Sequence, residues 1–365
     1  MAFTVAAIRE TAAGERRVAI TPETCKKLRA AGATVVLQAG VGESAHFPDA
    51  AYDGAEFVAD GDAVLARADV LLCVQPPAVD RLPALKQGAV IIGLLAAGAD
   101  AAREAQLNAR QATSFPLERL PRTTRAQAMD VLSSQAGMAS YKATLIAAQV
   151  APRFFPMLTT AAGTIRPSKV LVVGAGVAGL QAIATAKRLG AQVEGFDVRP
   201  ETREQIESLG AKFLDLGVSA KGEGGYAREL TADERAEQQR RLADHLKGVD
   251  VIITTAAVPG RPAPKIVNAA MVAGMKPGSV IVDLPAESGG NCELTQAGQT
   301  VVVGGVSVVG PTHLASSGVL HASEMYARNL FNFTQLLIKD GALHLNWDDD
   351  LVARTCHLHA GAVRG

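Results

Sequence analysis

The sequence is poor in aromatic residues and carries no net charge. Aromatic side chains make up 4% of the 365 residues, with a single Trp. The 36 Lys and Arg residues are balanced by 36 Asp and Glu residues. A chain without a basic excess lacks the electrostatic footprint that binds phosphate backbones, so we expect no nucleic acid partner.

Long apolar runs and paired cysteines are also missing. No stretch of about 20 apolar residues runs without charge or glycine, which excludes a membrane-spanning segment. The first residues lack the basic and apolar parts of a secretory signal. The four cysteines stand singly, and His357 and His359 beside Cys356 lack a third ligand at a suitable spacing, so we expect no metal site. These absences favour a soluble cytoplasmic protein.

Glycine and aliphatic residues are abundant instead. The chain has 35 Gly and 48% hydrophobic residues, which excludes a disordered protein. Its length predicts two domains, at about 100–200 residues each. Short apolar runs, such as 70–74 and 90–95, alternate with helical patterns, and the alternation recurs more clearly from 169 to 309. This pattern predicts an α/β protein with two doubly wound domains.

Two long helical patterns, 124–150 and 324–338, flank the second of these regions. We interpret them as crossing helices, by which the chain enters the middle domain and returns from it. The predicted domains are then a discontinuous one, formed by residues 1–135 and 320–365 and lining a cleft, and a middle one, formed by residues 136–319. The tail alternates apolar and polar residues and is expected to add a hairpin to the first domain.

A glycine fingerprint marks the start of the middle domain. Gly174, Gly176 and Gly179 form a G-x-G-x-x-G motif between a predicted strand and a predicted helix, with Val177 at the turn. The first glycine permits a tight turn, the second lets the backbone approach a pyrophosphate, and the third allows close packing of helix on strand. The phosphates then bind free N–H groups at the positive end of the helix. The motif predicts a Rossmann dinucleotide site.

An acidic residue follows at the spacing that this kind of site requires. Asp197 ends the next predicted strand, 18 residues beyond Gly179. A carboxylate there accepts hydrogen bonds from both ribose hydroxyls and repels a 2′-phosphate, which favours NAD(H) over NADP(H). Arg199, two residues further on, could instead bind a phosphate, so this preference stays open.

Six blocks of the sequence are distinctive: ERRVAITPE (15–23), RAQAMDVLSSQAGMASYKA (125–143), FPMLTTAAGTI (155–165), GVAGLQAIATAKRLGA (176–191), ITTAAVPGRPAP (253–264) and MKPGSVIVDLPAESGGNCELT (275–295). They resemble one family, the NAD(H)-binding domain or separate alpha subunit of proton-translocating nicotinamide nucleotide transhydrogenase. The alanine dehydrogenases share its fold and are the nearest alternative. The resemblance implies a Rossmann NAD-binding domain beside a discontinuous flavodoxin-like domain.

The resemblance also implies an activity and partners. This family binds NADH and passes its hydride to NADP+ held on a partner domain, while membrane subunits couple the transfer to proton movement. It further implies a homodimer at the cytoplasmic face of the inner membrane, associated with membrane-spanning subunits and an NADP(H)-binding domain, and no metal cofactor. Two alternatives remain open: a stand-alone NAD-dependent amino-acid dehydrogenase and a non-enzymatic NADH-binding module.

Four polar residues match positions that the family uses around the nicotinamide ring: Arg122, Gln127, Asp130 and Ser133. The last three are spaced by three residues, so a continuous helix would place them on one side. The resemblance implies that Arg122, Asp130 and Ser133 orient the ring and that Gln127 reaches toward the second nucleotide. Without the resemblance, a polar stripe of this kind would more often face water.

Further nucleotide contacts are expected from a glycine-rich loop and from the turns around it. Gly225 and Tyr226 match a mobile loop of the family that closes over bound nucleotide, and Gln238 matches another contact. Ala257, after the strand predicted at 251–255, falls where a Rossmann loop passes the nicotinamide ribose. Alanine dehydrogenases carry a catalytic Lys where this chain has Gln75, which argues against that alternative.

Overall fold

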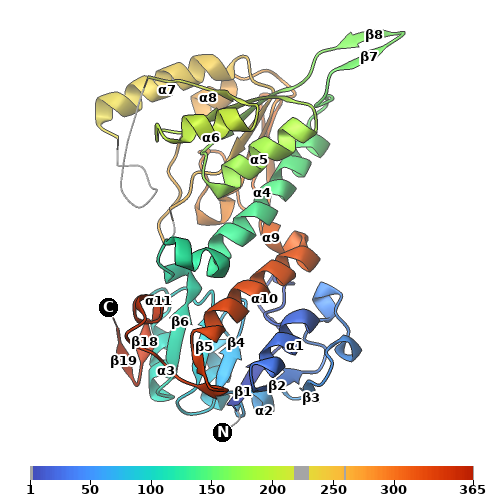
Figure 1. The fold of residues 1–365 in the computed structure, drawn as a ribbon. Helices are drawn as coiled ribbons and strands as arrows, with labels where there is room; N and C mark the ends of the chain where they lie inside the picture. Colours follow the sequence, from blue (N-terminus) through green and yellow to red (C-terminus); the bar gives the residue numbers. More distant parts are fainter. Residues whose placement is uncertain (1–2, 218–229, 259, 365) are drawn as a thin grey trace. The chain divides into compact units, whose positions relative to one another are not determined.

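The computed structural model describes residues 3–217, 230–258 and 260–364, and the predicted contacts Gly225 and Tyr226 lie outside these ranges. The chain divides into two compact units (Figure 1). Unit 1 comprises residues 1–135 and 316–365, and unit 2 comprises residues 136–315. Both are mixed α/β structures built on parallel strands, which confirms the predicted fold class.

Unit 1 is built on an eight-stranded sheet in the order β19-β18-β6-β5-β4-β1-β2-β3. Its strands are β1 (Phe3–Ala7), β2 (Ala33–Gln38), β3 (Glu56–Val58), β4 (Val70–Leu72), β5 (Val90–Gly93), β6 (Thr113–Pro116), β18 (Leu358–His359) and β19 (Ala362–Val363), with a separate pair β16 (Ile338–Lys339) and β17 (Ala342–Leu343). Its helices are α1 (Pro22–Ala30), α2 (Gly61–Leu65), α3 (Ala101–Ala109), α10 (Val319–Gln335) and α11 (Asp350–Thr355), and its 3-10 turns are η1 (Glu43–Ala45), η2 (Asp49–Ala51), η3 (Val79–Ala84), η4 (Leu117–Arg119) and η5 (Thr124–Met129).

Strands β1 to β6 run parallel, and β1 lies between β2 and β4. Buried side chains cover both faces of this sheet: Val5 packs in a cluster with Leu330 of α10, while Ala6 packs on the other face with Leu107 of α3. Burial on both faces explains why the sequences of these strands are largely unbroken apolar runs. The expected tail hairpin is present, because β18 pairs antiparallel with both β19 and β6.

Unit 2 contains a seven-stranded sheet in the order β11-β10-β9-β12-β13-β15-β14. Its strands are β9 (Lys169–Val173), β10 (Gln192–Phe196), β11 (Lys212–Phe213), β12 (Val251–Thr254), β13 (Val280–Asp283), β14 (Thr300–Val303) and β15 (Val306–Val309), with a separate hairpin of β7 (Leu158–Thr160) and β8 (Gly163–Ile165). Its helices are α5 (Val177–Arg188), α6 (Thr202–Ser208), α7 (Ala232–Leu246) and α8 (Ala269–Ala273), with the 3-10 turn η6 (Ala286–Ser288); α4 (Val131–Val150) and α9 (Leu314–Ser317) run across the unit boundaries.

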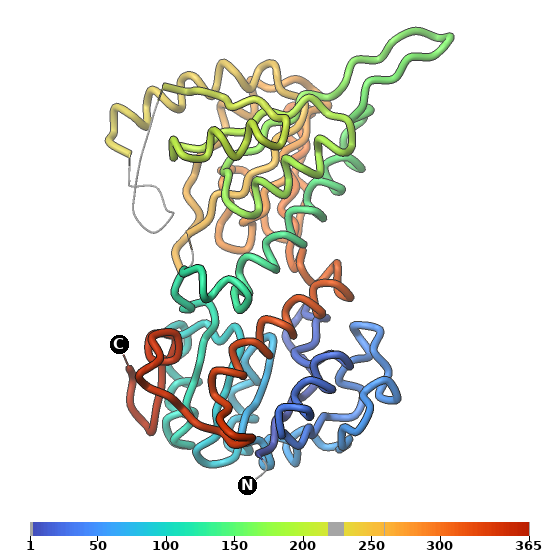
Figure 2. The backbone as a smooth tube through the Cα atoms, in the orientation of Figure 1, coloured from blue at the N-terminus to red at the C-terminus, as the bar shows by residue number. Residues whose placement is uncertain are grey.

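All neighbouring strands of this sheet are parallel except β14 and β15. Ile183 of α5 packs on one face with Val172, and Leu242 of α7 packs on the other with Leu171. The β7–β8 hairpin, which the sequence analysis did not predict, projects from the body of unit 2 (Figure 2). Among the described residues, no helix combines the length and the apolarity needed to cross a bilayer.

The predicted continuous helix from 124 to 150 is wrong. The chain forms the short turn η5 up to Met129, and Asp130 then leaves the helical conformation, with φ −75° and ψ 92°. Helix α4 begins only at Val131. The second predicted helix is shifted, since α10 begins at Val319, five residues before its expected start at 324.

Candidate functional site

The glycine turn joins β9 to α5 and needs glycine at two positions for steric reasons. Gly174 has a φ of +93°, and a Cβ there would lie 2.7 Å from the Thr255 Oγ1. A Cβ on Gly179 would lie 1.8 Å from the carbonyl oxygen of Gly174. The helix therefore rests directly on the turn before it, and no larger residue fits at Gly179 without moving the backbone.

Gly176 serves a different purpose, because a Cβ there would meet none of the described residues within 4 Å. It is the N-cap residue of α5, and no side chain caps the helix at that end. Val177, the first helical residue, is 51% exposed. The first N–H groups of a helix have no partners within it and form its positive end. The space beside Gly176 thus fits a phosphate group bound by these N–H groups.

Asp197 follows β10 and lies beside the glycine turn. Its Oδ2 accepts a 2.7 Å hydrogen bond from the backbone N–H of Ala175. The backbone N–H of Arg199 donates to Oδ1 over 2.9 Å, and the guanidinium donates through Nε to Oδ1 and through Nη2 to Oδ2. Asp197 as a whole residue is 9% exposed. The structure thus brings Asp197 to the turn, as the spacing predicts, and pairs it with Arg199.

A buried polar network that sequence reasoning missed supports the loop after β12. The Asn291 Oδ1 accepts from the Ala256 N–H, and its Nδ2 donates to the Ala256 carbonyl oxygen. Asp283 holds Asn291 in turn, because its Oδ1 accepts from the Asn291 N–H over 3.0 Å. Asn291 and Asp283 are both fully buried. The network fixes the backbone beside Ala257, which is itself exposed.

One signal in the sequence could have pointed to this network. Asp283 ends an otherwise apolar strand, and a buried carboxylate needs several hydrogen bonds. Its Oδ2 accepts from the Cys292 N–H and from the Thr295 hydroxyl. Gly290 permits the approach, because a Cβ there would lie 2.4 Å from that Oδ2. Gln238, another predicted contact, is 8% exposed on α7.

The four predicted nicotinamide contacts all lie in unit 1. Arg122 precedes η5 and Gln127 lies within it, whereas Asp130 and Ser133 lie where α4 begins. Arg122 and Gln127 are exposed. The Asp130 carboxylate accepts from the Ser133 N–H over 2.9 Å and from the Ser133 hydroxyl over 2.6 Å. The structure therefore joins Asp130 and Ser133, but the predicted stripe along one continuous helix is wrong. Asp130 instead caps the first turn of α4.

A second set of polar residues, also missed, fills the carboxyl end of the parallel sheet in unit 1. The Glu10 carboxylate accepts from the backbone N–H groups of Val74 and Gln75, over 2.6 and 3.0 Å. Burial raises the pKa of Glu10 from 4.5 to about 7, against the lowering effect of these two hydrogen bonds. The acid thus joins the ends of β1 and β4, where a doubly wound sheet usually binds its ligand.

Glu15 and Arg17 lie beside Glu10. Arg17 donates to both carboxylate oxygens of Glu15, over 2.8 and 2.6 Å, and the Ser316 hydroxyl donates to Oε1 over 2.6 Å. Burial raises the pKa of Glu15, but the hydrogen bonds and charge of Arg17 outweigh it and lower the value to about 2. The Gln75 Nε2 donates to Glu15 as well. The polar groups of these side chains are therefore hydrogen-bonded to one another.

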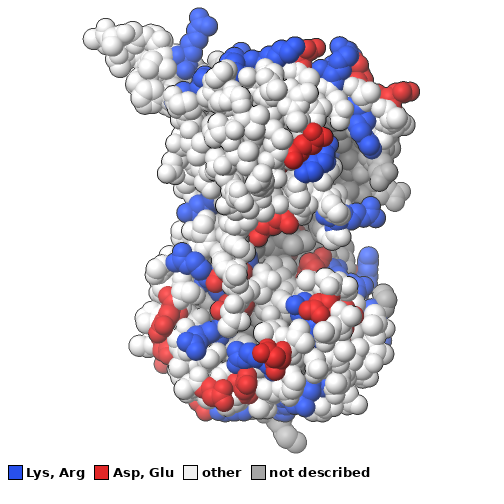
Figure 3. Space-filling model, turned by 180° about the vertical axis from the view of Figure 1, so that it is seen from behind, with Lys and Arg blue, Asp and Glu red and all other residues white. Residues whose placement is uncertain are grey.

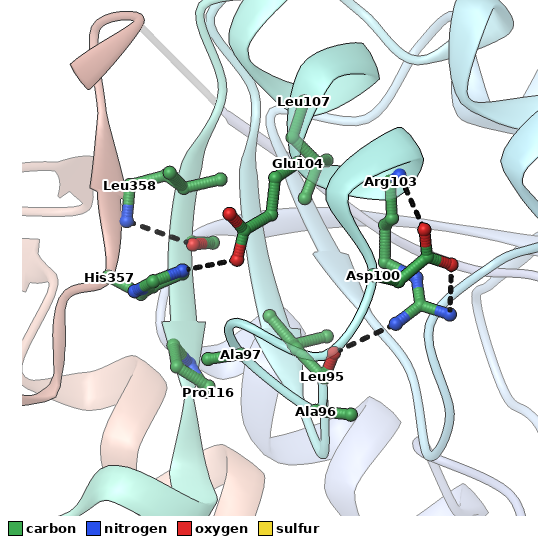
Figure 4. Close-up of a pocket in the computed structure, with 11 residues that line it drawn as sticks. Leu95, Ala96, Ala97, Asp100, Arg103, Glu104, Leu107, Pro116, His357 and Leu358 are labelled. Carbon is green, nitrogen blue, oxygen red and sulfur yellow. Dashed lines mark hydrogen bonds and ion pairs between the residues drawn. The ribbon is translucent and has the colours of Figure 1, made fainter. Parts of the chain in front are cut away.

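A narrow pocket of unit 1, between α3 and β18, is lined by charged side chains that pair with one another. Figure 4 shows Glu104 paired with His357 and Arg103 paired with Asp100. In the described ranges, no three His, Cys, Asp or Glu side chains are grouped to hold a metal ion. Acidic and basic side chains are interspersed over unit 1 on the face drawn in Figure 3, without a patch of one sign.

The fold and the glycine turn together define a dinucleotide-binding protein of the Rossmann class. The chain belongs to the alanine dehydrogenase/PNT family: the model of the family's N-terminal domain matches residues 6–139, and that of its C-terminal domain matches residues 143–365. This membership confirms the family predicted from the sequence and supports NAD(H) as the nucleotide.

Relatives within the family carry transhydrogenase names. An NAD(P) transhydrogenase alpha subunit polypeptide of Rhodospirillum rubrum is 43% identical, over 98% of this chain and 97% of the relative. A crystal structure of transhydrogenase from Sinorhizobium meliloti superposes with a TM-score of 0.89 at 43% identity, covering 99% of both chains. An alanine dehydrogenase of Mycobacterium tuberculosis is more distant, with 32% identity over 77% of this chain and 72% of the relative.

Proposed function

We propose that this chain is the NAD(H)-binding component of a proton-translocating transhydrogenase, which passes hydride between NADH and NADP+ bound on a partner subunit. The observation that carries the proposal is the turn at Gly176, where no side chain caps α5 and no described residue lies within 4 Å of an added Cβ. The similarity to transhydrogenase alpha subunits selects this reaction among those of the family. Membrane subunits would couple the transfer to proton movement and hold the chain at the cytoplasmic face of the inner membrane.

The residues of this chain have binding and orienting roles in the proposal. The first N–H groups of α5, from Val177 onward, bind the pyrophosphate, and Asp197 binds the adenine ribose. Gly225, Tyr226, Gln238 and Ala257 complete the nucleotide contacts. Bound NAD(H) supplies the hydride, so the reaction needs positioning and exclusion of water rather than a protein acid or base.

Asp130 and Ser133 fit an orienting role, because each fixes the other. With both carboxylate oxygens held by Ser133, the side chain has one preferred orientation at the start of α4. Arg122 and Gln127 would add an orienting cation and a contact with the second nucleotide. Preorganised donors and acceptors of this kind hold a ring in a reactive position without taking part in proton transfer.

A homodimer is part of the proposal, and the β7–β8 hairpin supports it. The hairpin and the segment before it expose large apolar side chains: Phe154 is 52% exposed, Met157 64% and Ile165 44%. The hairpin projects from unit 2 (Figure 1). An exposed apolar arm of this kind favours burial against another subunit.

The alternative of a stand-alone alanine-type dehydrogenase has less support. Gln75 takes the place of the lysine that such enzymes use, and its Nε2 donates to Glu15 over 3.3 Å. Glu10 and Glu15 fill the surroundings of Gln75 with the chain's own carboxylates. A non-enzymatic NADH-binding module would leave the Asp130–Ser133 pair with only its capping role at the start of α4.

The proposal is tested by hydride exchange in a mixture of this chain with an NADP(H)-binding partner domain. NADH and an oxidised NAD analogue are supplied with NADPH, and reduction of the analogue is followed. We expect exchange that depends on both proteins. Asp130→Asn should slow it by about 10- to 100-fold through loss of positioning. NADH bound without exchange would contradict the proposal, as would NADH production from alanine by the chain alone.

Asp60→Asn is the matched control for Asp130→Asn. Asp60 caps α2 of the same unit, since its Oδ1 accepts from the Asp62 N–H over 3.0 Å. It has no place in the proposed site. Equal slowing by the two substitutions would show that Asp130 acts only on helix stability.

A further inference from the structure

The ribose-binding acid of unit 2 has all of its acceptor positions filled by the chain itself. A carboxylate offers about four lone-pair sites. Two of those of Asp197 are taken by the backbone N–H groups of Ala175 and Arg199. The other two are taken by the Arg199 guanidinium, through Nε over 2.9 Å and Nη2 over 2.8 Å. Both ribose hydroxyls cannot bind Asp197 while this arrangement lasts.

The four donors differ in their freedom to leave. The two backbone N–H groups are fixed by the turn after β9 and by the chain after β10. The guanidinium stands at the end of a flexible side chain, and the Arg199 side chain is 17% exposed while that of Asp197 is 8% exposed. The guanidinium therefore covers the carboxylate, and among these donors it alone belongs to a side chain that can change its rotamer.

We propose that the Arg199 guanidinium occupies the positions on Asp197 that the ribose diol would take. The guanidinium must then move away from Asp197 when NAD(H) binds. The exchange conserves hydrogen bonds, because the fork of a guanidinium presents two N–H donors to two oxygens and a vicinal diol presents two O–H donors. Arg199 is then an internal competitor that weakens NADH binding. This inference rests on the proposed NAD(H) site but not on hydride transfer.

The same movement determines how the site discriminates against NADPH. A 2′-phosphate replaces one hydroxyl with negative charge, which Asp197 repels. The displaced guanidinium stays tethered two residues from Asp197 and can pair with that phosphate, because guanidinium–phosphate pairs are strong and bidentate. Arg199 therefore lowers the affinity for NADH and raises the affinity for NADPH. It thus reduces the preference for NADH over NADPH that Asp197 creates.

The test is equilibrium binding of NADH and of NADPH to the full chain, followed by nucleotide fluorescence. Arg199→Ala should bind NADH about three- to thirtyfold more tightly and NADPH several-fold more weakly, as expected for loss of one charge-assisted pair. Arg199→Lys keeps the charge but not the fork, and should show a smaller gain for NADH with NADPH binding retained.

Arg203→Ala is the matched control. Arg203 lies on α6, pairs with Asp215 over 2.8 Å and is exposed, so its loss removes one positive charge from the same region without touching Asp197. Both nucleotides should bind this variant within about twofold of the parent. Weaker or unchanged NADH binding in both Arg199 variants would overturn the inference. If no variant or parent binds NADH, the nucleotide site itself is refuted, which is a different result from loss of hydride exchange.

Discussion

The two units share a topology around the first strand of their main sheets, but the carboxyl end of that strand is open in unit 2 and filled in unit 1. In each, the first strand lies between a strand that follows directly and one that follows later: β1 between β2 and β4, and β9 between β10 and β12. The carboxyl ends at such a point are where open α/β sheets bind ligands. In unit 2 that end is a glycine turn with space beside it, whereas in unit 1 it is filled by Glu10, Glu15 and Arg17.

The difference shows that a fold provides a place for a ligand and the side chains decide whether it is available. Unit 2 has its acids at the margins: Asp197 beside the turn, and Asp283 buried beneath the neighbouring loop. Unit 1 has an acid on the backbone N–H groups at the end of β4. We therefore expect one dinucleotide site in each chain, in unit 2.

The largest expected effect is that of Gly179→Ala. The added Cβ would overlap the Gly174 carbonyl oxygen at 1.8 Å, so the turn must move or unit 2 must unfold, at about 4 kcal/mol or more. We expect NADH binding to be lost in a fluorescence titration. Gly137→Ala on α4 is the control, since its Cβ would meet nothing within 4 Å. A variant with parent-like NADH affinity would contradict the steric account of the turn.

The next largest effect is expected in unit 1, from Arg17→Met. This change leaves Glu15, whose side chain is 4% exposed, without its cation. Removing one partner of a buried ion pair costs about 3–5 kcal/mol, which chemical denaturation should detect as a loss in the free energy of unfolding. Arg328→Met breaks an exposed pair with Glu23 and should cost less than about 1 kcal/mol. Equal losses in the free energy of unfolding from Arg17→Met and Arg328→Met would contradict this difference between a buried and an exposed ion pair.

A smaller effect is expected from pH, through Glu10. Its pKa is raised to about 7 in the folded protein, from 4.5. The unfolded chain then loses its proton first, so the free energy of unfolding should fall as pH rises from 4.5 to about 7, by up to about 3 kcal/mol. Glu10→Gln should abolish this fall between pH 5 and pH 8.

Glu23→Gln is the control for that measurement. The pKa of Glu23 is lowered to about 2, chiefly by hydrogen bonds from Arg328 and Lys27, so its own contribution changes only below the measured range. This variant should keep the parent's pH dependence. A parent protein whose stability is flat between pH 5 and pH 8 would contradict the raised pKa of Glu10.

Local patterns were sufficient to predict the fold class and many element positions. Strands β4, β5 and β12 lie within the predicted runs 70–74, 90–95 and 251–255, because short uninterrupted apolar runs have few alternatives in an α/β chain. The break at Asp130 was not predicted, because the apolar spacing continues through it and does not reveal that the Asp130 backbone leaves the helical conformation. The β7–β8 hairpin is too exposed to carry an apolar pattern.

The polar groups of the candidate site were harder to predict. Glycine spacing marks Gly174 to Gly179 because backbone sterics are local. The contacts of Glu10 with Val74, and of Asn291 with Ala256, join residues far apart in the chain, so no local pattern reveals them. Arg199 was considered as a phosphate ligand, but its pairing with Asp197 depends on a side-chain conformation that spacing does not determine.

The most direct test of one open site per chain is NADH titration of the parent and of Gly176→Val. A Cβ at Gly176 would have no neighbour within 4 Å among the described residues, so the fold should be retained while the phosphate position is blocked. We predict one NADH per parent chain, and at least about a hundredfold weaker binding to the variant with an unchanged unfolding transition. Two NADH per parent chain, or undiminished binding to a folded Gly176→Val, would contradict the account.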